Sequence, residues 1–179
     1  MKIEELMTKS VATCGCDDSL EAAARLFWER DCGAIPVVDS NRVVIGMLTD
    51  RDACIAAWSR GARLSELRVA DTMSKRVQAC WPDDSVEVVL ELMVEHHVRR
   101  LPVVDIERRL VGMVSLCDLA RAAASDTRPS NRDRRLARVG AALAEITRPH
   151  CELSEAPEPA ALPATRSPAP LVPVGSAIG

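Results

Sequence analysis

One segment of the chain occurs twice, and this repeat constrains the fold more than any other feature. Residues 7–52 align with residues 73–118 without a gap, at a constant offset of 66 positions. Of the 46 aligned pairs, 18 are identical, and they include Pro36 with Pro102. A duplicated unit typically folds as two similar lobes related by a pseudo-twofold axis, with grooves between them. Because only two copies are present, a long solenoid is not expected.

The composition indicates a protein of medium size with an aliphatic core. The chain has 179 residues, one Phe, three Trp, no Tyr and a net charge of -3. This charge gives no general attraction to nucleic acid. The N-terminus is acidic and lacks the apolar stretch of a secretory signal, and no apolar run approaches the roughly 18 residues of a membrane helix. We therefore expect a soluble cytoplasmic protein without a membrane or nucleic-acid partner.

The seven cysteines are interpreted mainly as small apolar residues. Their number is odd, and no secretory context favours a disulfide framework. A redox or metal site is the alternative, built from Cys14 and Cys16 with His96 and His97. Its spacing matches none of the standard zinc patterns, so we predict no metal site.

Each copy predicts the same order of elements. A short strand precedes a helix, and Asp18 or Asp84 could cap that helix while a Glu three places on reaches back. Two strands joined by a polar turn follow, and their aliphatic content predicts burial on both faces. A second helix closes the unit. The expected strands are 11–14, 34–39 and 43–49, then 77–80, 100–105 and 110–115; the expected helices are 19–30 and 51–59, then 85–97 and 116–124.

The last third of the chain differs in composition. After a possible cap at Ser130, the apolar residues Leu136, Val139, Leu143 and Ile146 fall at helical spacing, among many arginines. Seven prolines follow residue 148, without a hydrophobic period, which predicts disorder. The predicted organisation is a first unit at 1–60, a linker at 61–72, a second unit at 73–124, an Arg-rich possible helix at 125–148 and a Pro-rich disordered tail at 149–179.

Both copies contain the pattern Gly-x-x-Thr/Ser-x-x-Asp where a strand meets a helix, at 46–52 and 112–118. One interpretation is structural, because the hydroxyl residue can cap the helix and the Asp can answer its backbone. The functional interpretation uses the same geometry. The helix N-terminus and hydroxyl suit a phosphate, and an ionised Asp can hold the two hydroxyls of a ribose. The Gly would let the backbone approach a ligand, and a flat apolar slot between strands could take a purine.

On these residues the chain resembles a tandem pair of cystathionine β-synthase (CBS) domains, of the stand-alone bacterial type that includes stress-response members. The resemblance covers about residues 1–124 and leaves the last third unexplained. The matching segments are 7–11, 18–22, 35–39 and 46–52 in the first copy, and 73–77, 84–87, 100–105 and 112–118 in the second.

The resemblance implies an α+β fold in which two βαββα units pack sheet to sheet with pseudo-twofold symmetry, plus a C-terminal extension. It also implies a homodimer, a flat disk of four units, that senses AMP, ADP, ATP or S-adenosylmethionine. No cofactor is required and no catalysis is expected. The residues implied for phosphate and ribose are Thr49, Arg51, Asp52, Ser115 and Asp118. Those implied to flank the base are Val11, Ala12, Thr13, Val77, Gln78 and Ala79.

The two implied sites differ in charge. Cys117 stands where the first copy has Arg51, so the second site has less positive charge. Arg99 and Arg100 could restore it by binding phosphate, whereas Gly33 and Ala34 occupy those places in the first copy. We therefore expect two unequal sites.

Three functions are open at this point. The first is a ligand sensor whose state is read by an unknown protein partner. The second is a structural or interaction module with degenerate sites, which contacts a protein or nucleic acid through the Arg-rich segment. The third is an enzyme, for which the chain offers no nucleophile–base–orienter set and no P-loop. The first function is our prediction.

Overall fold

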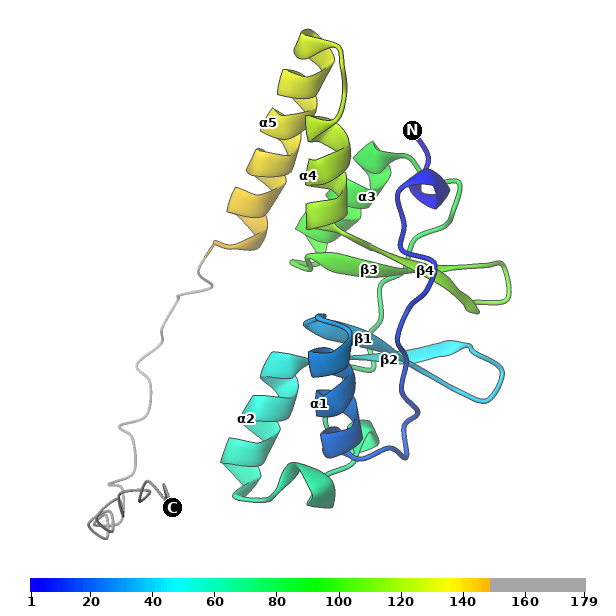
Figure 1. Cartoon of the computed structure of the whole chain (residues 1–179), viewed down its shortest axis with the longest axis vertical. Helices are drawn as coiled ribbons and strands as arrows, with labels where there is room; N and C mark the ends of the chain where they lie inside the picture. Colours follow the sequence, from blue (N-terminus) through cyan, green and yellow to red (C-terminus); the bar gives the residue numbers. More distant parts are fainter. Residues whose placement is uncertain (149–179) are drawn as a thin grey trace, which may run out of the picture. The chain divides into compact units, whose positions relative to one another are not determined.

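The computed structural model describes residues 1–148, which form one compact unit; the predicted tail lies outside the described residues. Two lobes each place a two-stranded antiparallel sheet toward the other lobe and two helices on the outside (Figure 1). This confirms the predicted α+β pair of packed units. Lobe one contains α1 (Leu20–Glu29), β1 (Ala34–Val38), β2 (Val44–Thr49) and α2 (Asp50–Arg60). Lobe two contains α3 (Val86–Glu95), β3 (Arg100–Val104), β4 (Leu110–Ser115) and α4 (Leu116–Ala124), followed by α5 (Pro129–Ile146).

The first helix of each lobe is capped by serine, and not by the predicted aspartate. The Ser19 hydroxyl accepts a hydrogen bond from Ala22 N at 3.2 Å. In lobe two, the Ser85 hydroxyl accepts one from Val88 N at 3.3 Å. The neighbouring Asp18 instead accepts from Gly15 N at 2.8 Å, which closes a turn before the helix. The cap therefore lies one residue later than the sequence pattern indicated.

The two sheets have the same register and the same irregularity. Ala34 pairs with Thr49 and Arg100 with Ser115, and a bulge follows Val37 in one sheet and Val103 in the other. The predicted first strand of each unit is wrong in extent: it is reduced to one parallel bridge, from Cys14 to Val37 or from Cys80 to Val103. The turn that follows each cysteine ends the pairing after this single residue.

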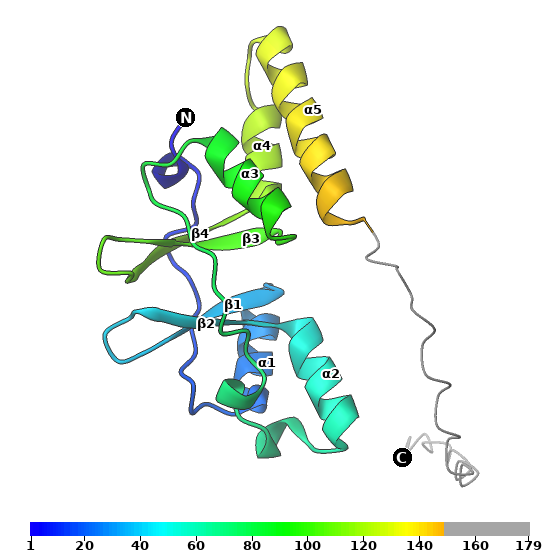
Figure 2. The same ribbon diagram turned by 180° about the vertical axis from the view of Figure 1, so that it is seen from behind.

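Each lobe completes its core with the segment that precedes the other lobe's repeat. Ile3, in the short helix η1 (Ile3–Glu5), is fully buried in the core of lobe two. Val69, in η3 (Val69–Asp71), occupies the matching place in lobe one. A third short helix, η2 (Leu64–Glu66), packs beside α1. The chain therefore crosses twice between the lobes, which ties them together (Figure 2).

The lobes meet along their sheets and along these crossing segments. Thr8 bridges to Met113, and Ser74 bridges to Met47. A methyl group at Gly46 would collide with the Met73 side chain and lie 3.2 Å from Ser74 O; Gly112 faces Met7 and Thr8 O in the same way. The glycine of the motif is thus needed where a crossing segment packs closely on the sheet. Its expected role in letting the backbone approach a ligand stays a prediction. The apolar contact is completed by Val44, Val104 and Leu110.

Helix α5 packs against α3 and α4, on the outer side of lobe two (Figures 1 and 2). It begins at Pro129 after Arg128, without a side-chain cap, so the expected cap at Ser130 is wrong. Its buried residues are Val139, Ala142 and Ile146, while Leu136 and Leu143 of the predicted stripe are 38% and 44% exposed. None of the helices within residues 1–148 is long and apolar enough to cross a lipid bilayer.

Candidate ligand clefts between the lobes

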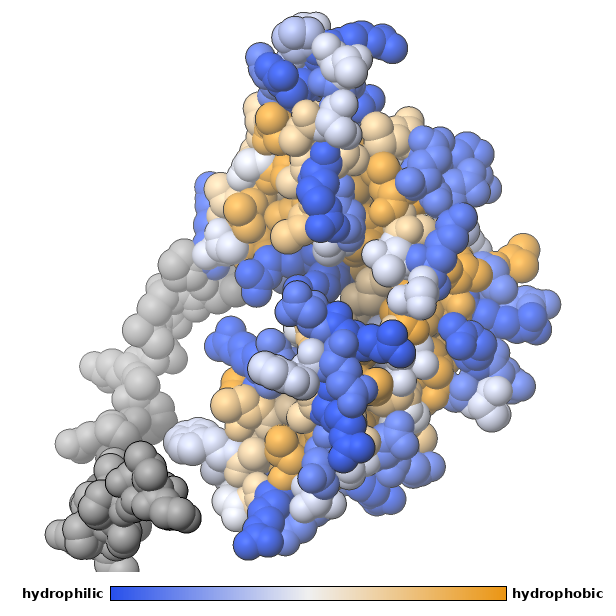
Figure 3. Space-filling view, in the orientation of Figure 1, coloured by the Kyte–Doolittle hydropathy of each residue, from blue (hydrophilic) through white to orange (hydrophobic). Residues whose placement is uncertain are grey.

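Two clefts lie between the lobes, and the repeat offset relates one to the other. The first, which we call the Thr49 cleft, has a volume of about 570 Å³; the second, the Ser115 cleft, has about 460 Å³. Most residues that line the Thr49 cleft have a counterpart 66 positions away in the Ser115 cleft. Hydrophilic residues gather where the lobes face each other on one side of the molecule, and hydrophobic patches lie among hydrophilic residues on the helices (Figure 3). The twin clefts are therefore built by the duplication itself.

The Thr49 cleft contains a hydroxyl–carboxylate pair at the start of α2. Thr49 Oγ1 accepts from Asp52 N at 3.1 Å and donates to Asp52 Oδ2 at 2.7 Å, while Thr49 N donates to the same oxygen at 3.0 Å. The structural interpretation of the motif, a capping box, is thus present. Oδ1 of Asp52 has no hydrogen-bond partner within residues 1–148. Asp52 is half-buried and lines the cleft, so this second oxygen is available to accept from a ligand hydroxyl.

The Ser115 cleft repeats this pair with one difference. Ser115 N and Oγ donate to Asp118 Oδ2 at 2.8 and 2.6 Å, and Asp118 N donates back to Ser115 Oγ at 3.2 Å. Here the second carboxylate oxygen, Oδ1, is paired with Arg121. The carboxylate of the second cleft is therefore engaged on both oxygens, whereas that of the first is not.

The backbone at the start of α2 is also occupied. Asp50 N donates to Gly33 O at 3.4 Å, and Arg51 N donates to Asp50 Oδ1 at 2.7 Å. Together with the capping box, these bonds use the first free N–H groups of the helix. A phosphate in the Thr49 cleft would therefore depend on side chains, and not on the helix N-terminus that the sequence pattern suggested.

The base-flanking residues predicted from the resemblance are divided by the fold. Val11 and Ala12 line the Ser115 cleft, and Val77 and Gln78 line the Thr49 cleft, so each cleft combines the capping pair of one lobe with a crossing segment that leads into the other repeat. Thr13 and Ala79 line neither cleft; Ala79 packs beside Val44 in the contact between the sheets.

The arginines are placed differently from the sequence interpretation. Arg51 and Cys117 are both exposed, and neither residue lines a cleft. The difference between them therefore does not alter the charge of a cleft lining. Arg99, expected to serve the second site, lines the Thr49 cleft. Arg100 lines both clefts, because it lies at the start of β3 between them.

Several polar residues of the clefts were not predicted from the sequence. Arg76, His96 and His97 line the Thr49 cleft, and Arg30 and Asp31 line the Ser115 cleft. The signal was available in the repeat, because Arg30 and Asp31 align with the two histidines at the offset of 66. Each of these two pairs follows the first helix of its own lobe and lines the cleft that contains the capping pair of the other lobe.

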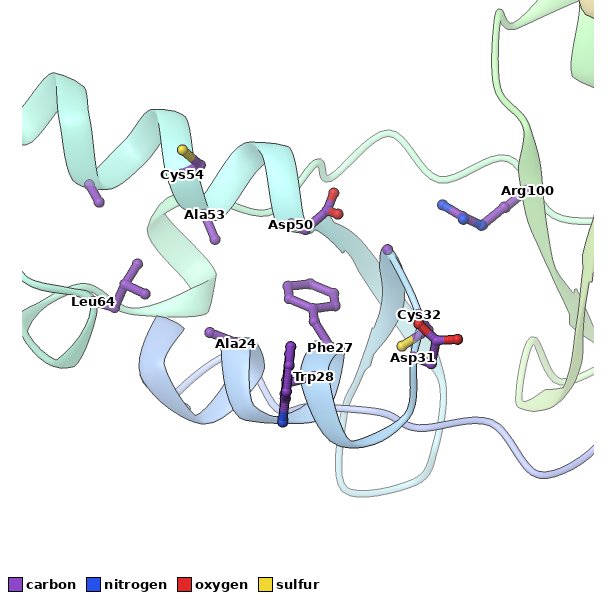
Figure 4. Close-up of a pocket in the computed structure, with 12 residues that line it drawn as sticks. Ala24, Phe27, Trp28, Asp31, Cys32, Asp50, Ala53, Cys54, Leu64 and Arg100 are labelled. Atoms are coloured by element: carbon purple, nitrogen blue, oxygen red, sulfur yellow. The ribbon is translucent and has the colours of Figure 1, made fainter.

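A third cavity lies outside the clefts, on lobe one. This α1–α2 groove has a volume of about 780 Å³, and Ala24 and Phe27 of α1 face Ala53 of α2 across it (Figure 4). Trp28 and Ala57 also line it. Arg100 reaches toward its edge from lobe two, near Asp50. The Trp28 side chain stands out at 88% exposure.

Two of the cysteines, Cys14 and Cys80, are buried at matching positions of the two lobes. Burial raises the pKa of Cys14 to about 12, and the nearby Asp18 carboxylate adds to this shift. Burial likewise raises the pKa of its counterpart Cys80 to about 12. Such thiols remain protonated near neutral pH and are poor nucleophiles and metal ligands. No cluster of three His, Cys, Asp or Glu residues suited to a metal ion occurs within residues 1–148.

The family model described as CBS domain matches residues 3–58 and residues 69–125. The chain is 40% identical over 118 residues to the CBS domain-containing protein YhcV of Bacillus subtilis, covering 66% of this chain and 82% of the relative. It is 34% identical over 117 residues to Hypoxic response protein 1 of Mycobacterium tuberculosis, covering 65% and 81%.

Solved structures of CBS pairs have the same fold. Hypoxic Response Protein I, crystallised with two coordinated zinc ions, is 33% identical, with a TM-score of 0.62 over 68% of this chain and 98% of that one. CBSX2 in complex with AMP is 24% identical, with a TM-score of 0.61 over 71% and 98%. The CBS domain pair of protein MJ0100, in complex with 5-methylthioadenosine and S-adenosyl-L-methionine, is also 24% identical, with a TM-score of 0.62 over 68% and 94%.

Proposed function

Because this chain belongs to the CBS-domain family, we propose that it is a regulatory module that binds adenosine-containing ligands in the two clefts between its lobes. The observation that carries the proposal is the pair of clefts related by the repeat, each with a hydroxyl–carboxylate pair at a helix start. The likeness to CBS pairs crystallised with AMP and with S-adenosyl-L-methionine supports this ligand class.

The proposed ligand position follows from the polar groups of the Thr49 cleft. The two ribose hydroxyls would donate to Asp52, whose Oδ1 has no other partner within the described residues. The base would lie along Val77 and Gln78, where the extended backbone offers N–H and C=O groups to a purine edge. The phosphates would then point toward the arginines of lobe two.

A ligand in a cleft would contact both lobes at once. Each cleft combines residues of one repeat with residues of the other, so occupancy would favour one arrangement of the lobes over another. A ligand shifts such an equilibrium only by its difference in affinity for the two arrangements. A protein partner that binds one arrangement would read this difference, which is the proposed regulatory role.

We place the predicted homodimer at the α1–α2 groove. This surface contains an exposed side chain, Trp28, and a groove lined by Ala24, Ala53 and Ala57. A twofold interface needs such a self-complementary surface, because the same residues meet on both copies. Trp58 of α2 is also 83% exposed. Two Trp from each copy would bury about 600–1,000 Å² at 150–250 Å² each, a large part of the roughly 1,200–2,000 Å² of a stable interface.

The alternative function, binding through the Arg-rich segment, has less support. The apolar side of α5 is already occupied by α3 and α4. Two of its arginines are paired within the chain, Arg135 with Asp126 at 3.0 Å and Arg138 with Glu87 at 3.2 Å. A partner of α5 would have to use the remaining exposed face.

Isothermal titration calorimetry tests the proposed function directly. AMP, ATP and S-adenosylmethionine are titrated into the full chain and into Asp52→Asn and Asp118→Asn. Asparagine keeps an acceptor for the capping bond but removes the charge, so the fold is preserved. We expect binding that weakens at least about 10-fold when the carboxylate of the occupied cleft is replaced, which corresponds to loss of a charged hydrogen bond.

Thermal melting of both variants is the control for their fold. If no ligand binds the folded wild-type chain at millimolar concentration, the proposal is overturned. Undiminished binding in the double variant Asp52→Asn/Asp118→Asn would also overturn it, because the ligand would then lie elsewhere.

A further inference from the structure

The two clefts share a backbone frame but differ in the charge of their linings. Three arginines, Arg76, Arg99 and Arg100, line the Thr49 cleft, where Asp52 is the one acidic lining residue. The Ser115 cleft is lined by two arginines, Arg30 and Arg100, and by two acidic residues, Asp31 and Asp118. Leaving the histidines aside, the Thr49 cleft is more positive by two unit charges.

The arginines of the Thr49 cleft have no acidic partner within residues 1–148. None of Arg76, Arg99 and Arg100 forms an ion pair or a side-chain hydrogen bond there. Three like charges around one cavity repel each other unless an anion lies between them. The first free N–H groups of α2 are already bonded, so these guanidinium groups are the donors that remain for phosphate oxygens.

The Ser115 cleft has the opposite character. Asp31 takes the place that His97 has in the other cleft, and Ser10 takes the place of Arg76. Asp118 is partly neutralised by Arg121, but Asp31 makes no ion pair within the described residues. A chain of phosphates in this cleft would meet that carboxylate at short range, where like charges disfavour binding.

We propose that the chain sorts its ligands by charge: the Thr49 cleft takes adenosine phosphates, and the Ser115 cleft takes adenosyl compounds without phosphate, neutral or cationic. This inference rests on the proposed function, and names the ligand class of each cleft. Arg100 lines both clefts and does not discriminate between them. The discrimination comes from the residues that differ between the repeats, chiefly Arg76 against Ser10 and His97 against Asp31.

Site-resolved NMR titration of the full chain tests the inference. The backbone amide of Gln78 reports on the Thr49 cleft, and that of Ala12 reports on the Ser115 cleft. The probes are adenosine, ATP without magnesium and S-adenosylmethionine, at low ionic strength so that exposed charges are little screened. We expect ATP to shift Gln78 at a concentration about 10-fold lower than Ala12, while adenosine shows a much smaller preference.

Exchanging the residues at one matched position gives the sharpest variants. Arg76→Ser makes the Thr49 cleft resemble the other, and should weaken its ATP affinity about 10-fold while changing adenosine affinity less than about twofold. Ser10→Arg should strengthen ATP binding in the Ser115 cleft. Lys75→Ser is the control, because it removes a neighbouring positive charge that lines neither cleft, and it should leave both affinities nearly unchanged.

The outcomes separate this inference from the function on which it rests. If adenosine shifts both amides but ATP shows no preference for the Thr49 cleft, sorting by charge is overturned and adenosyl binding stands. If Arg76→Ser weakened ATP affinity equally at both clefts, sorting by charge would also be overturned. If neither adenosine nor ATP shifts either amide at millimolar concentration, the proposed function fails as well.

Discussion

Within residues 1–148, α5 covers the outer helices of lobe two, whereas no counterpart of α5 covers the equivalent surface of lobe one. The residues of lobe two beneath α5 include Leu90 and Leu119, which are 7% and 1% exposed. Their counterparts at the offset of 66, Ala24 and Ala53, line the α1–α2 groove. Both lobes thus have the same backbone arrangement, but their outer side chains differ in size. They are large where α5 covers them and small where the groove lies.

The clefts show the same division between frame and lining. Both capping boxes have nearly the same hydrogen bonds, because each also holds a helix start in place. The other charged residues around them differ between the repeats. A duplicated protein can therefore keep one fold and acquire two ligand preferences.

The largest effect should come from truncating the core beneath α5. Leu119→Ala removes a side chain that is 1% exposed in the core that α3, α4 and α5 share, so we expect a loss of about 2–5 kcal/mol of unfolding free energy. Urea denaturation measures it. The control is Val88→Ala on α3, which is 43% exposed and should cost less than about 0.5 kcal/mol. Equal costs would contradict the described burial beneath α5.

A smaller effect is expected at the open surface of lobe one. Trp28→Asp should leave the fold intact but weaken self-association about 30-fold or more, as the loss of about 2 kcal/mol at an interface centre would do. Analytical ultracentrifugation over a concentration series measures the dissociation constant. Ile106→Asp is the matched control, because Ile106 is 87% exposed in the β3–β4 turn. A wild-type chain that stays monomeric would reject the α1–α2 groove as a dimer interface.

The smallest effect concerns the ion pair that joins α5 to α3. The side chains of Arg138 and Glu87 are 55% and 48% exposed, and a guanidinium nitrogen of Arg138 lies 3.2 Å from Oε1 of Glu87. Solvent screening limits such a pair, so Arg138→Ala should cost less than about 1 kcal/mol. A double-mutant cycle with Glu87→Ala isolates the pair from the packing of the arginine stem. A coupling as large as the effect of Leu119→Ala would mean that charge, and not apolar burial, holds α5.

The repeat made the two lobes and the order of their main elements predictable, because periodic apolar segments and turn residues are local signals. Single-residue features were less accessible. The cap at Ser19 and the single bridge at Cys14 depend on a turn held by Asp18, and a short pattern fits either residue as a cap. The buried stripe of α5 was misplaced because only the contact with α3 and α4 selects Ala142 over Leu143.

The cleft was predictable in its frame and only in part in its lining, since Val77 and Gln78 were expected there whereas Arg76 was not. The motif that contains Thr49 and Asp52 identified the helix start, because capping chemistry has a fixed spacing. The role of Gly46 and the arginines of the lining depend on contacts between segments far apart in the chain. Nothing local indicates that Arg100 would face both clefts, since this follows from how the two sheets pack.

The proposed ligand position can be tested by a crystal structure of the full chain soaked with AMP. We predict electron density for the nucleoside between the lobes, with ribose hydroxyls within hydrogen-bond distance of Asp52 Oδ1 and the base along Val77 and Gln78. Density for AMP on an outer helix face, with both clefts filled by ordered water alone, would contradict it.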